Sequence, residues 1–393
     1  MVINALSALR GGGQTYLLNI LRCVDETNPP VKITVIANTK NVALFVPFQS
    51  EGVDVFEAKF ASKNIVFRVF WEFFILPFWL ASNNSKQYFA PGGIMISLMP
   101  RNCKSFTALR NMLPFDKAER QRFPLFSYIR FKLWLLRFVF LLSYRMVDGV
   151  IFISNYSRDV VEQYMPTIKN KSVVIYHGLN EDFRRSGENL ILAKELGLNA
   201  GEYYLYVSIL DVYKAQKEVI ESWKQLVEKG FTYPLVLVGQ NHNKYGKDIV
   251  NAIENDKSGL IRYLGPVEYH RLPSLYQNAR ALIFASSCEC CPNILLENLA
   301  SGRPVFSSAI QPMPEFGGDA AIYFDPYEPT SLADKVVGFE ADDTNFAEYG
   351  NLALEKSKDF DWQKTTNATI SYIIGNTLIM VGDDPSLMAV QLW

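Results

Sequence analysis

Hydrophobic positions in the first half of the chain alternate between short continuous runs and longer stretches with helical periodicity. The runs predict strands at residues 2–6, 32–36, 88–90, 149–153 and 173–176. The periodic stretches predict helices at residues 15–24, 67–80 and 126–145. The second helix is expected to break near Pro77, because proline removes a backbone donor.

The second half of the chain repeats this alternation. Strands are predicted at residues 203–208, 235–238, 261–264, 281–285, 304–307 and 321–324. Helices are predicted at residues 216–229, 245–255, 272–279, 293–300 and 331–339. Strands that alternate with helices indicate a parallel sheet covered on both faces, so two such runs predict an α/β protein with two Rossmann-like domains. The polar stretch 181–200 separates the two runs.

Composition agrees with two globular domains. The chain has 393 residues, of which 49% are hydrophobic and 20% charged, which suits large buried cores. A formal net charge of −1 argues against a dedicated nucleic-acid-binding protein. The five cysteines are odd in number and unevenly spread, and no secretory signal is apparent at the N-terminus. We therefore expect a reduced, cytoplasmic protein.

Two apolar segments approach the length of a membrane-spanning helix. Residues 65–80 contain Arg68 and Glu72, and residues 125–142 contain Arg130, Lys132 and Arg137. Because neither offers an uninterrupted apolar run of about 18 to 20 residues, neither is expected to be a good spanning helix.

A glycine triplet, Gly11-Gly12-Gly13, follows the first predicted strand and precedes a helix. Glycines at this place allow a ligand to approach the backbone, and a helix N-terminus favours a phosphate. Gly12 and Gly13 are therefore candidate donor-binding residues, and a plain tight turn is the alternative.

A second candidate region is the strand–loop–helix at residues 281–302, which contains Glu289 and Glu297. Open α/β sheets bind nucleotides where a strand ends and a helix begins. The amides around Asn293, Ile294 and Leu295 can face a diphosphate, and a carboxylate inside the helix can accept bonds from ribose hydroxyls. The alternative is that both glutamates are only solvated.

These residues carry a family resemblance. Glu289 and Glu297 are followed by Gly302, Pro304 and Val305, in an arrangement that resembles the retaining glycosyltransferases of family 4 (group 1, GT-B fold). Further pieces occur in the family's order: the early glycine turn, Ser154-Asn155-Tyr156-Ser157, His177-Gly178-Leu179-Asn180, Leu264-Gly265, Pro314-Glu315 and Gly318-Asp319.

The resemblance implies a GT-B fold, two facing Rossmann-like domains with a donor cleft between them. Residues 1–182 correspond to an acceptor-side domain, residues 183–361 to a nucleotide-sugar-binding domain, and residues 362–393 to a helix that packs back on the first domain, plus a tail. It also implies metal-independent, retaining transfer of a hexosyl-type sugar from a nucleotide-diphosphate donor. Lys214 and Glu289 take the catalytic roles, the latter contacting the donor sugar, and Glu297 contacts the ribose.

The sequence departs from the family at two places. Ser208-Ile209 occupies the position of a usual arginine, so Lys214 acts alone or with help from Lys217. A first-domain histidine is replaced in a region that begins Arg110-Asn111, which makes these two residues the acceptor-side candidates.

No cofactor is expected beyond the nucleotide sugar, and no metal site. The segment Cys288-Glu289-Cys290-Cys291 is too compressed for tetrahedral zinc, and Asp359-Phe360-Asp361 lies in a late helix instead of at a strand end. Two other functions stay open. One is an NAD(P)-dependent Rossmann oxidoreductase, although no acid follows the strand at 32–36, and the other is a catalytically silent glycosyltransferase-like binding subunit.

The expected acceptor is a glycan or a lipid-linked glycan of surface polysaccharide (lipopolysaccharide) biosynthesis, as in many relatives. The helix at 126–145 mixes Arg130, Lys132, Arg137 and Arg145 with aromatic residues, which suits a peripheral contact with an anionic membrane at the cytoplasmic face. Alternatively, the apolar stripe of this helix packs on the sheet of the first domain. Both interpretations are compatible if one face of the helix is buried and the other is basic.

Overall fold

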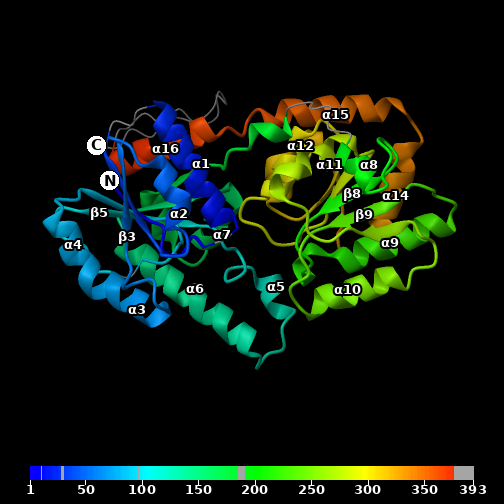
Figure 1. Ribbon diagram of the computed structural model, residues 1–393. Coiled ribbons are helices and arrows are strands. Elements are labelled where there is room, and N and C mark those ends of the chain that lie inside the picture. The colour runs from blue at the N-terminus through cyan, green and yellow to red at the C-terminus, as the bar shows by residue number, and fades with distance from the viewer. Residues whose placement is uncertain (10, 28–30, 96, 185–190, 376–393) are drawn as a thin grey trace. The chain divides into compact units, whose positions relative to one another are not determined.

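The computed structural model describes residues 1–9, 11–27, 31–95, 97–184 and 191–375 (Figure 1). The chain divides into two compact units. Unit 1 contains Met1–Gly178 and the chain from Trp362 onward, and unit 2 contains Leu179–Asp361. The sequence predicts a boundary after residue 182, four residues further along the chain than Gly178. The tail beyond residue 375 lies outside the described residues.

Unit 1 is built on a seven-stranded parallel sheet with the order β3-β2-β1-β4-β5-β6-β7. Its strands are β1 (Val2–Asn4), β2 (Ile33–Ala37), β3 (Val53–Glu57), β4 (Gln87–Ala90), β5 (Lys104–Leu109), β6 (Gly149–Phe152) and β7 (Ser172–Val174). In the centre of the sheet, Ile3 is in register with Val35 on one side and with Phe89 on the other. The strand order reverses between β1 and β4, which makes their carboxyl ends the switch point of this sheet.

Helices cover both faces of this sheet. They are α1 (Gly12–Thr27), α2 (Val42–Phe45), α3 (Ile65–Phe70), α4 (Leu76–Ser82), α5 (Lys117–Gln121), α6 (Tyr128–Met146), α7 (Asn155–Glu162) and α16 (Trp362–Ile374). Short helical turns lie at Val46–Phe48 and Pro166–Lys171. Figure 1 shows α1 and α16 on one side of the sheet, and α3, α4 and α6 on the other. Buried side chains of α1 and α16, including Leu17, Ile20 and Ile370, form one core with Ile3 and Val35 of the sheet.

The helix expected at residues 67–80 is longer and irregular. A π-helical turn at Trp71–Ile75 joins α3 to α4, just before Pro77. Proline lacks the N–H group that would continue the regular ladder, so the irregularity falls in the preceding turn. This irregular helix buries the side chains of Trp71, Leu76 and Leu80.

The expectation that this segment is a poor spanning helix is not met by length and composition. Ile65–Ser82 comprises 18 residues with a mean hydropathy of 1.6, of which 17% are buried, and is long and apolar enough to cross a membrane. The prediction rests on an uninterrupted apolar run. The mean hydropathy of the segment stays high although it includes Arg68 and Glu72. These two side chains form an ion pair at 3.5 Å, and the Asn4 amide of β1 donates to Glu72 at 2.9 Å. The segment is thus tied to the sheet of unit 1.

Helix α6 has two distinct faces. Leu133, Phe140 and Tyr144 are buried, and the Tyr144 ring lies 6.2 Å from that of Phe152 in β6. The opposite face carries exposed aromatic residues. Packing on the sheet therefore leaves the outer face of α6 open.

Unit 2 is built on a six-stranded parallel sheet with the order β10-β9-β8-β11-β12-β13. Its strands are β8 (Tyr204–Val207), β9 (Leu235–Val238), β10 (Ile261–Tyr263), β11 (Ala281–Phe284), β12 (Val305–Ser308) and β13 (Ile322–Phe324). Leu205 is in register with Val236 and with Leu282. The order reverses between β8 and β11, as it does between β1 and β4 in unit 1.

Most helices of unit 2 connect one strand of its sheet to the next. The helices of this unit are α8 (Ile191–Glu195), α9 (Gln216–Glu228), α10 (Lys244–Glu254), α11 (Leu272–Asn278), α12 (Asn293–Ala300), α13 (Met313–Gly317), α14 (Pro329–Glu340) and α15 (Thr344–Ser357). Single 3₁₀ turns lie at Glu181–Phe183, Val212–Lys214, Tyr269–Arg271 and Gly318–Ala320. Two parallel sheets with helical crossovers confirm the predicted α/β class and its two Rossmann-like domains.

Candidate active site

The strongest candidate site lies at the carboxyl ends of β8 and β11 in unit 2. Lys214 lies in the connection that follows β8, and Glu289 in the loop that follows β11. The strand order reverses between these two neighbours, and in open α/β sheets ligands bind at the strand ends where such a reversal occurs. The two residues that the sequence proposed as catalytic therefore meet at the switch point.

Lys214 is held in a buried, aromatic setting. Its side chain is only 6% exposed, and its ammonium lies 5.0 Å from the Tyr213 ring centroid and 5.3 Å from that of Phe284. The next residue, Ala215, has a left-handed φ of +51°, which turns the chain from the 3₁₀ turn into α9. The Tyr206 hydroxyl donates to the Lys214 carbonyl and anchors this turn.

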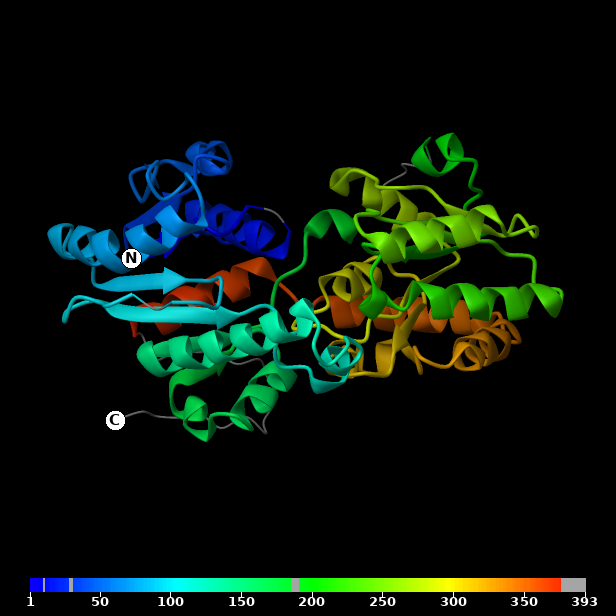
Figure 2. The same cartoon turned by 90° about the horizontal axis from the view of Figure 1, so that it is seen from below.

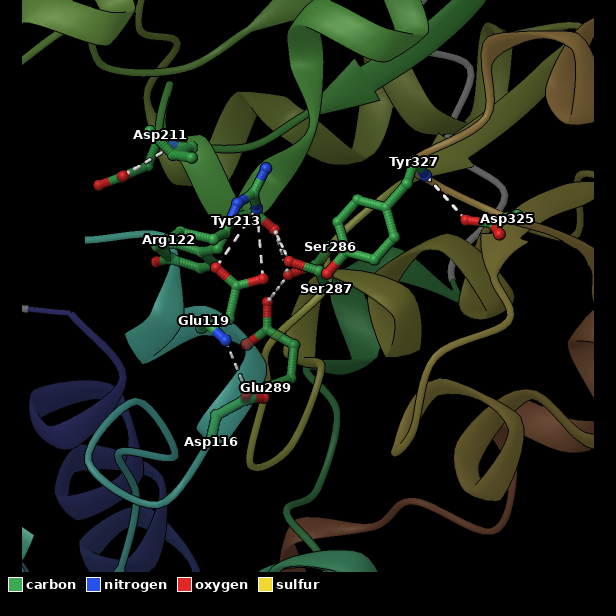
Figure 3. A network of polar contacts seen from close by, with 11 residues as sticks. Asp116, Glu119, Arg122, Asp211, Tyr213, Ser286, Ser287, Glu289, Asp325 and Tyr327 are labelled. Atoms are coloured by element: carbon green, nitrogen blue, oxygen red, sulfur yellow. Dashed lines mark hydrogen bonds and ion pairs between the residues drawn. The ribbon is translucent and has the colours of Figure 1, made fainter. Parts of the chain in front are cut away.

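Glu289 is the ionic partner of Lys214. Its carboxylate accepts a hydrogen bond from the Lys214 ammonium and another, at 2.8 Å, from the Ser286 hydroxyl. Figure 3 shows the Glu289 carboxylate directed toward Ser286, beside Ser287 and the backbone of Tyr213. The Ser287 N–H and hydroxyl both donate to the Tyr213 carbonyl, at 2.8 and 3.1 Å. These bonds fasten the loop after β11 to the turn after β8, so the pair is held from both strands.

The N-terminus of α12 follows the same loop. Pro292 occupies the N-cap, and the Asn293 N–H donates back to the Cys291 carbonyl at 3.0 Å. The Leu296 N–H bonds to the Pro292 carbonyl, which leaves the amides of Ile294 and Leu295 ahead of the helical ladder. Such amides, with the positive end of the helix dipole, suit an anionic group.

Glu297 lies inside α12 and is buried. One of its carboxylate oxygens accepts from the Tyr269 hydroxyl at 3.0 Å, and the other accepts from the Tyr276 hydroxyl at 3.2 Å. Burial raises the pKa of Glu297 to about 7, against the opposing effect of the two tyrosine hydrogen bonds. A carboxylate offers about four acceptor positions, so two bonds do not exhaust Glu297.

The remaining predicted residues lie in unit 1. Gly12 and Gly13 form the first turn of α1, and Arg110 follows β5. The Arg110 guanidinium lies 3.4 Å from the ring centroid of Tyr16, one turn further along α1. Asn111 accepts a hydrogen bond from the Leu113 N–H at 3.2 Å, which closes a local turn. The structure thus brings Arg110 to the helix that begins with the two glycines.

Some residues of these sites were not identified from the sequence. Tyr269 and Tyr276 come from separate helical elements, and only the fold brings them to Glu297. Gly92 and Gly93 follow β4 at the switch point of unit 1, where Gly93 has a φ of +85°. The sequence signal that could have identified Gly92 and Gly93 is a glycine pair directly after a predicted strand. Lys217, the cation that was expected to assist Lys214, is exposed.

Within residues 1–375, apart from the short gaps named above, no group of three or more His, Cys, Asp or Glu side chains is placed to hold a metal ion. The five cysteines are buried, and none of them forms a disulfide in the part of the chain that the structure describes.

Comparison with known proteins agrees with this geometry. Residues 191–353 match the family described as glycosyl transferases group 1. The O-antigen chain mannosyltransferase B of Escherichia coli is 26% identical over 227 residues, which cover 56% of this chain and 59% of that protein. The D-inositol 3-phosphate glycosyltransferase of Corynebacterium aurimucosum is 24% identical over 217 residues, covering 52% of this chain and 51% of that protein. The chain thus matches less than two thirds of the length of these relatives.

Solved structures share the whole fold. HepE from Anabaena, in complex with UDP and glucose, has a TM-score of 0.70 at 17% identity, over 95% of this chain and 98% of that one. WaaG, a glycosyltransferase involved in lipopolysaccharide biosynthesis, has a TM-score of 0.68 at 11% identity, over 96% of this chain and 100% of that one. At these identities the likeness concerns the fold, and the fold is GT-B. Residues 191–353 of the chain are thus similar to the group 1 glycosyl transferases.

Proposed function

We propose that this protein is a retaining glycosyltransferase that moves a hexosyl-type sugar from a nucleotide-diphosphate donor to a glycan or lipid-linked glycan. The observation that carries the proposal is the buried Lys214–Glu289 pair beside the N-terminus of α12, at the switch point of the unit 2 sheet. A cation and free helix amides at one place form a cradle for a diphosphate leaving group.

Each residue of the cradle has a role in this scheme. Lys214 and the amides of Ile294 and Leu295 stabilise the diphosphate as the bond to the sugar breaks. Glu289 contacts the donor sugar, and its bond to Lys214 keeps both side chains aligned before the donor arrives. Glu297 accepts hydrogen bonds from the ribose hydroxyls. The acceptor hydroxyl attacks from the face that the diphosphate leaves and passes its proton to the departing diphosphate, and no metal takes part.

Related proteins support this class of donor and acceptor. HepE was solved with UDP-glucose, and the similar Escherichia coli protein is a mannosyltransferase of the O-antigen chain. WaaG acts in lipopolysaccharide biosynthesis. We infer a role in the synthesis of a surface polysaccharide.

The surface of unit 1 supports a peripheral location at the cytoplasmic leaflet. Large apolar side chains are exposed on α3, on α4 and on the outer face of α6, among them Phe78 at 78% exposed. Figures 1 and 2 show these helices on the same side of unit 1. Exposed apolar patches of this kind mark interaction surfaces, and Arg130, Lys132, Arg137 and Arg145 of α6 add attraction to anionic lipids.

A thermal-shift screen across nucleotide sugars tests the proposal, followed by a transfer assay in which NMR reports the anomeric configuration of the product. We expect stabilisation by one nucleotide sugar and retention at the anomeric carbon. Stabilisation by NADH or NADPH alone would establish an oxidoreductase instead. Binding of a nucleotide sugar with neither transfer nor hydrolysis would identify a silent binding subunit.

A further inference from the structure

Unit 1 contains a cavity of about 330 Å³ whose lining includes none of its glycines. It is formed by α5, by the N-terminal half of α6 and by the residues that follow α7. The lining residues are Lys117, Arg120, Gln121, Arg130, Arg137 and Tyr164. Four of the six are cations, so the lining carries a concentrated positive charge.

Neutral groups hold the three arginines in place. Arg137 donates to the Tyr164 hydroxyl at 3.2 Å, and its guanidinium lies 4.9 Å from the centroid of that ring. Arg130 donates to the Phe123 carbonyl at 3.3 Å, and Arg120 donates to the Asp116 carbonyl at 3.0 Å. Each guanidinium has five N–H groups, so donors remain for a ligand.

The positive charge of the cavity is poorly compensated. The nearby Glu119 is paired with Arg122 at 3.2 Å, and the side chain of Asp116 caps α5 at the Glu119 N–H. Among the ion pairs of the described residues, none joins Lys117, Arg120, Arg130 or Arg137 to a carboxylate. Burial lowers the pKa of Arg120, and the neighbouring Arg137 and Arg130 lower it further, while Tyr164 and Asp116 act in the opposite direction. A multivalent anion would relieve this repulsion.

The cavity adjoins the exposed apolar face of α6. Arg130 and Arg137 are two helical turns apart and therefore share one face of the helix. Next to that face lie Phe131, Trp134 and Phe138, which are 60%, 50% and 54% exposed. Phe126, just before α6, is 98% exposed. Cationic and aromatic side chains therefore lie next to each other on α6. This arrangement suits a ligand with a charged head group and an apolar chain.

We propose that this cavity binds the phosphate head group of a membrane lipid, a phosphomonoester or diphosphate, while the lipid chains lie along the aromatic face of α6. The proposal rests on the membrane contact proposed above and adds a specific site to it. Guanidinium groups bind phosphate oxygens through paired hydrogen bonds, and Lys117 supplies a further charge. Attachment would thus depend on the kind of phosphate, beyond general attraction to a negative surface.

Flotation of the full chain with vesicles tests the proposal. The vesicles are phosphatidylcholine alone, or phosphatidylcholine with phosphatidic acid or with phosphatidylglycerol at matched surface charge. The test variant is Arg130→Gln/Arg137→Gln, and its control is Lys132→Gln/Arg145→Gln, which removes the same charge from the same helix outside the cavity. Inorganic pyrophosphate, measured by calorimetry, probes the phosphate chemistry without a bilayer, and thermal unfolding checks that both variants fold.

We expect the wild type to prefer phosphatidic acid, and the cavity variant to lose about tenfold in that binding while the control loses about twofold or less. Affinity for the nucleotide sugar should stay unchanged in both, so this result is independent of the donor site. Equal losses in the two variants, or no preference among anionic vesicles, would overturn the lipid site. Pyrophosphate binding that the cavity variant abolishes, without any vesicle preference, would assign the cavity to a free phosphate compound and reject the lipid.

Discussion

At the scale of single residues, Glu297 shows how burial changes what a carboxylate does. We expect Glu297→Ala, measured above pH 7 where the carboxyl group is ionised, to weaken nucleotide-sugar binding by tenfold or more while the fold persists, because hydrogen bonds to a charged group contribute about 1.5–3 kcal/mol each. Calorimetry with the donor identified by the screen measures the change. Unchanged affinity would contradict the ribose role. Tyr276→Phe, which removes one of the two hydroxyl partners and keeps the charge, serves as the control.

The raised pKa of Glu297 also predicts a pH dependence of stability. Its pKa is about 7 in the folded chain against an ordinary value of 4.5, so folding takes up a proton between these values. The stabilising contribution of the neutral acid is full below pH 4.5 and is lost as pH rises through 7. Relative to Glu297→Gln, the wild type should therefore lose melting temperature between pH 5 and pH 8. A difference that stays constant over this range would show that the pKa is ordinary.

Lys214 tests the chemistry of the leaving group. We expect Lys214→Ala to lower kcat by about a hundredfold and to affect donor affinity less, because the negative charge that Lys214 meets grows as the diphosphate departs. Steady-state kinetics separates the two effects, and Lys217→Ala is the control, since Lys217 is exposed. Wild-type activity should persist in EDTA. Its loss in EDTA, with recovery in manganese or magnesium, would contradict the metal-free scheme.

Sequence motifs predicted the charged residues of the candidate site, but not their partners. Glu289 and Lys214 could be proposed because each follows a strong apolar run that predicts a strand. Tyr269 and Tyr276 carried no such signal. A tyrosine in a helical segment is usually a packing residue, and its hydroxyl finds Glu297 only after β11 and α12 have brought the elements together.

At the scale of elements, fully buried strands were predicted well and half-polar strands were missed. β9 reads LVLV and β11 reads ALIF, and all residues of both are buried. β5 contains Ser105 and Thr107, which break the apolar run although both are buried. Thr107 donates to the Ala90 carbonyl at 2.7 Å, and Ser105 donates to Asp148. β3 is a half-exposed edge strand. The hydrogen-bond partners of these buried polar side chains come from other parts of the fold, so the local pattern does not show that the strand is buried.

In the turn after β4, we expect the addition of a single methyl group at Gly93 to destabilise the fold strongly. Gly93 has a φ of +85°, and a Cβ atom there would lie 2.3 Å from a Phe140 ring carbon and 3.0 Å from the Ala108 carbonyl. We expect Gly93→Ala to cost about 2–5 kcal/mol of unfolding free energy, from backbone strain and overpacking together. Gly197→Ala is the control, since Gly197 has a φ of +67° but no atom within 4 Å of the added methyl. Chemical denaturation compares them, and equal costs would show that the contact with Phe140 relaxes freely.

At the scale of the whole molecule, the two repeats of strand and helix were sufficient to predict two domains. The path of the chain is less regular, because the chain leaves unit 1 after Gly178 and returns to it at Trp362. Gly178 allows this close approach, since a Cβ atom there would lie 2.3 Å from the Trp362 backbone nitrogen. Periodicity describes individual elements, and it contains no information about which unit a late helix joins.

Helix α16 completes unit 1 from the far end of the chain. Ile370 and Ile373 are buried in the core shared with α1, the Thr365 hydroxyl donates to the Tyr176 carbonyl at 2.7 Å, and the Tyr372 hydroxyl donates to the Lys171 carbonyl at 2.8 Å. Unit 2 is continuous in sequence and has its own sheet, so its core does not depend on α16. Damage to α16 should therefore destabilise one unit selectively.

We expect Ile370→Ala/Ile373→Ala to lower the stability of unit 1 by about 4–8 kcal/mol, since each truncation of a buried isoleucine costs about 2–5 kcal/mol and neighbouring sites couple. Hydrogen exchange resolves the two units: amides of β1–β7 should lose protection, while those of β8–β13 keep it. Asn367→Ala, at an exposed position of the same helix, should leave both units unchanged. Equal loss of protection in both sheets would show that the units unfold together, and that a helix assigned to one stabilises the other as well.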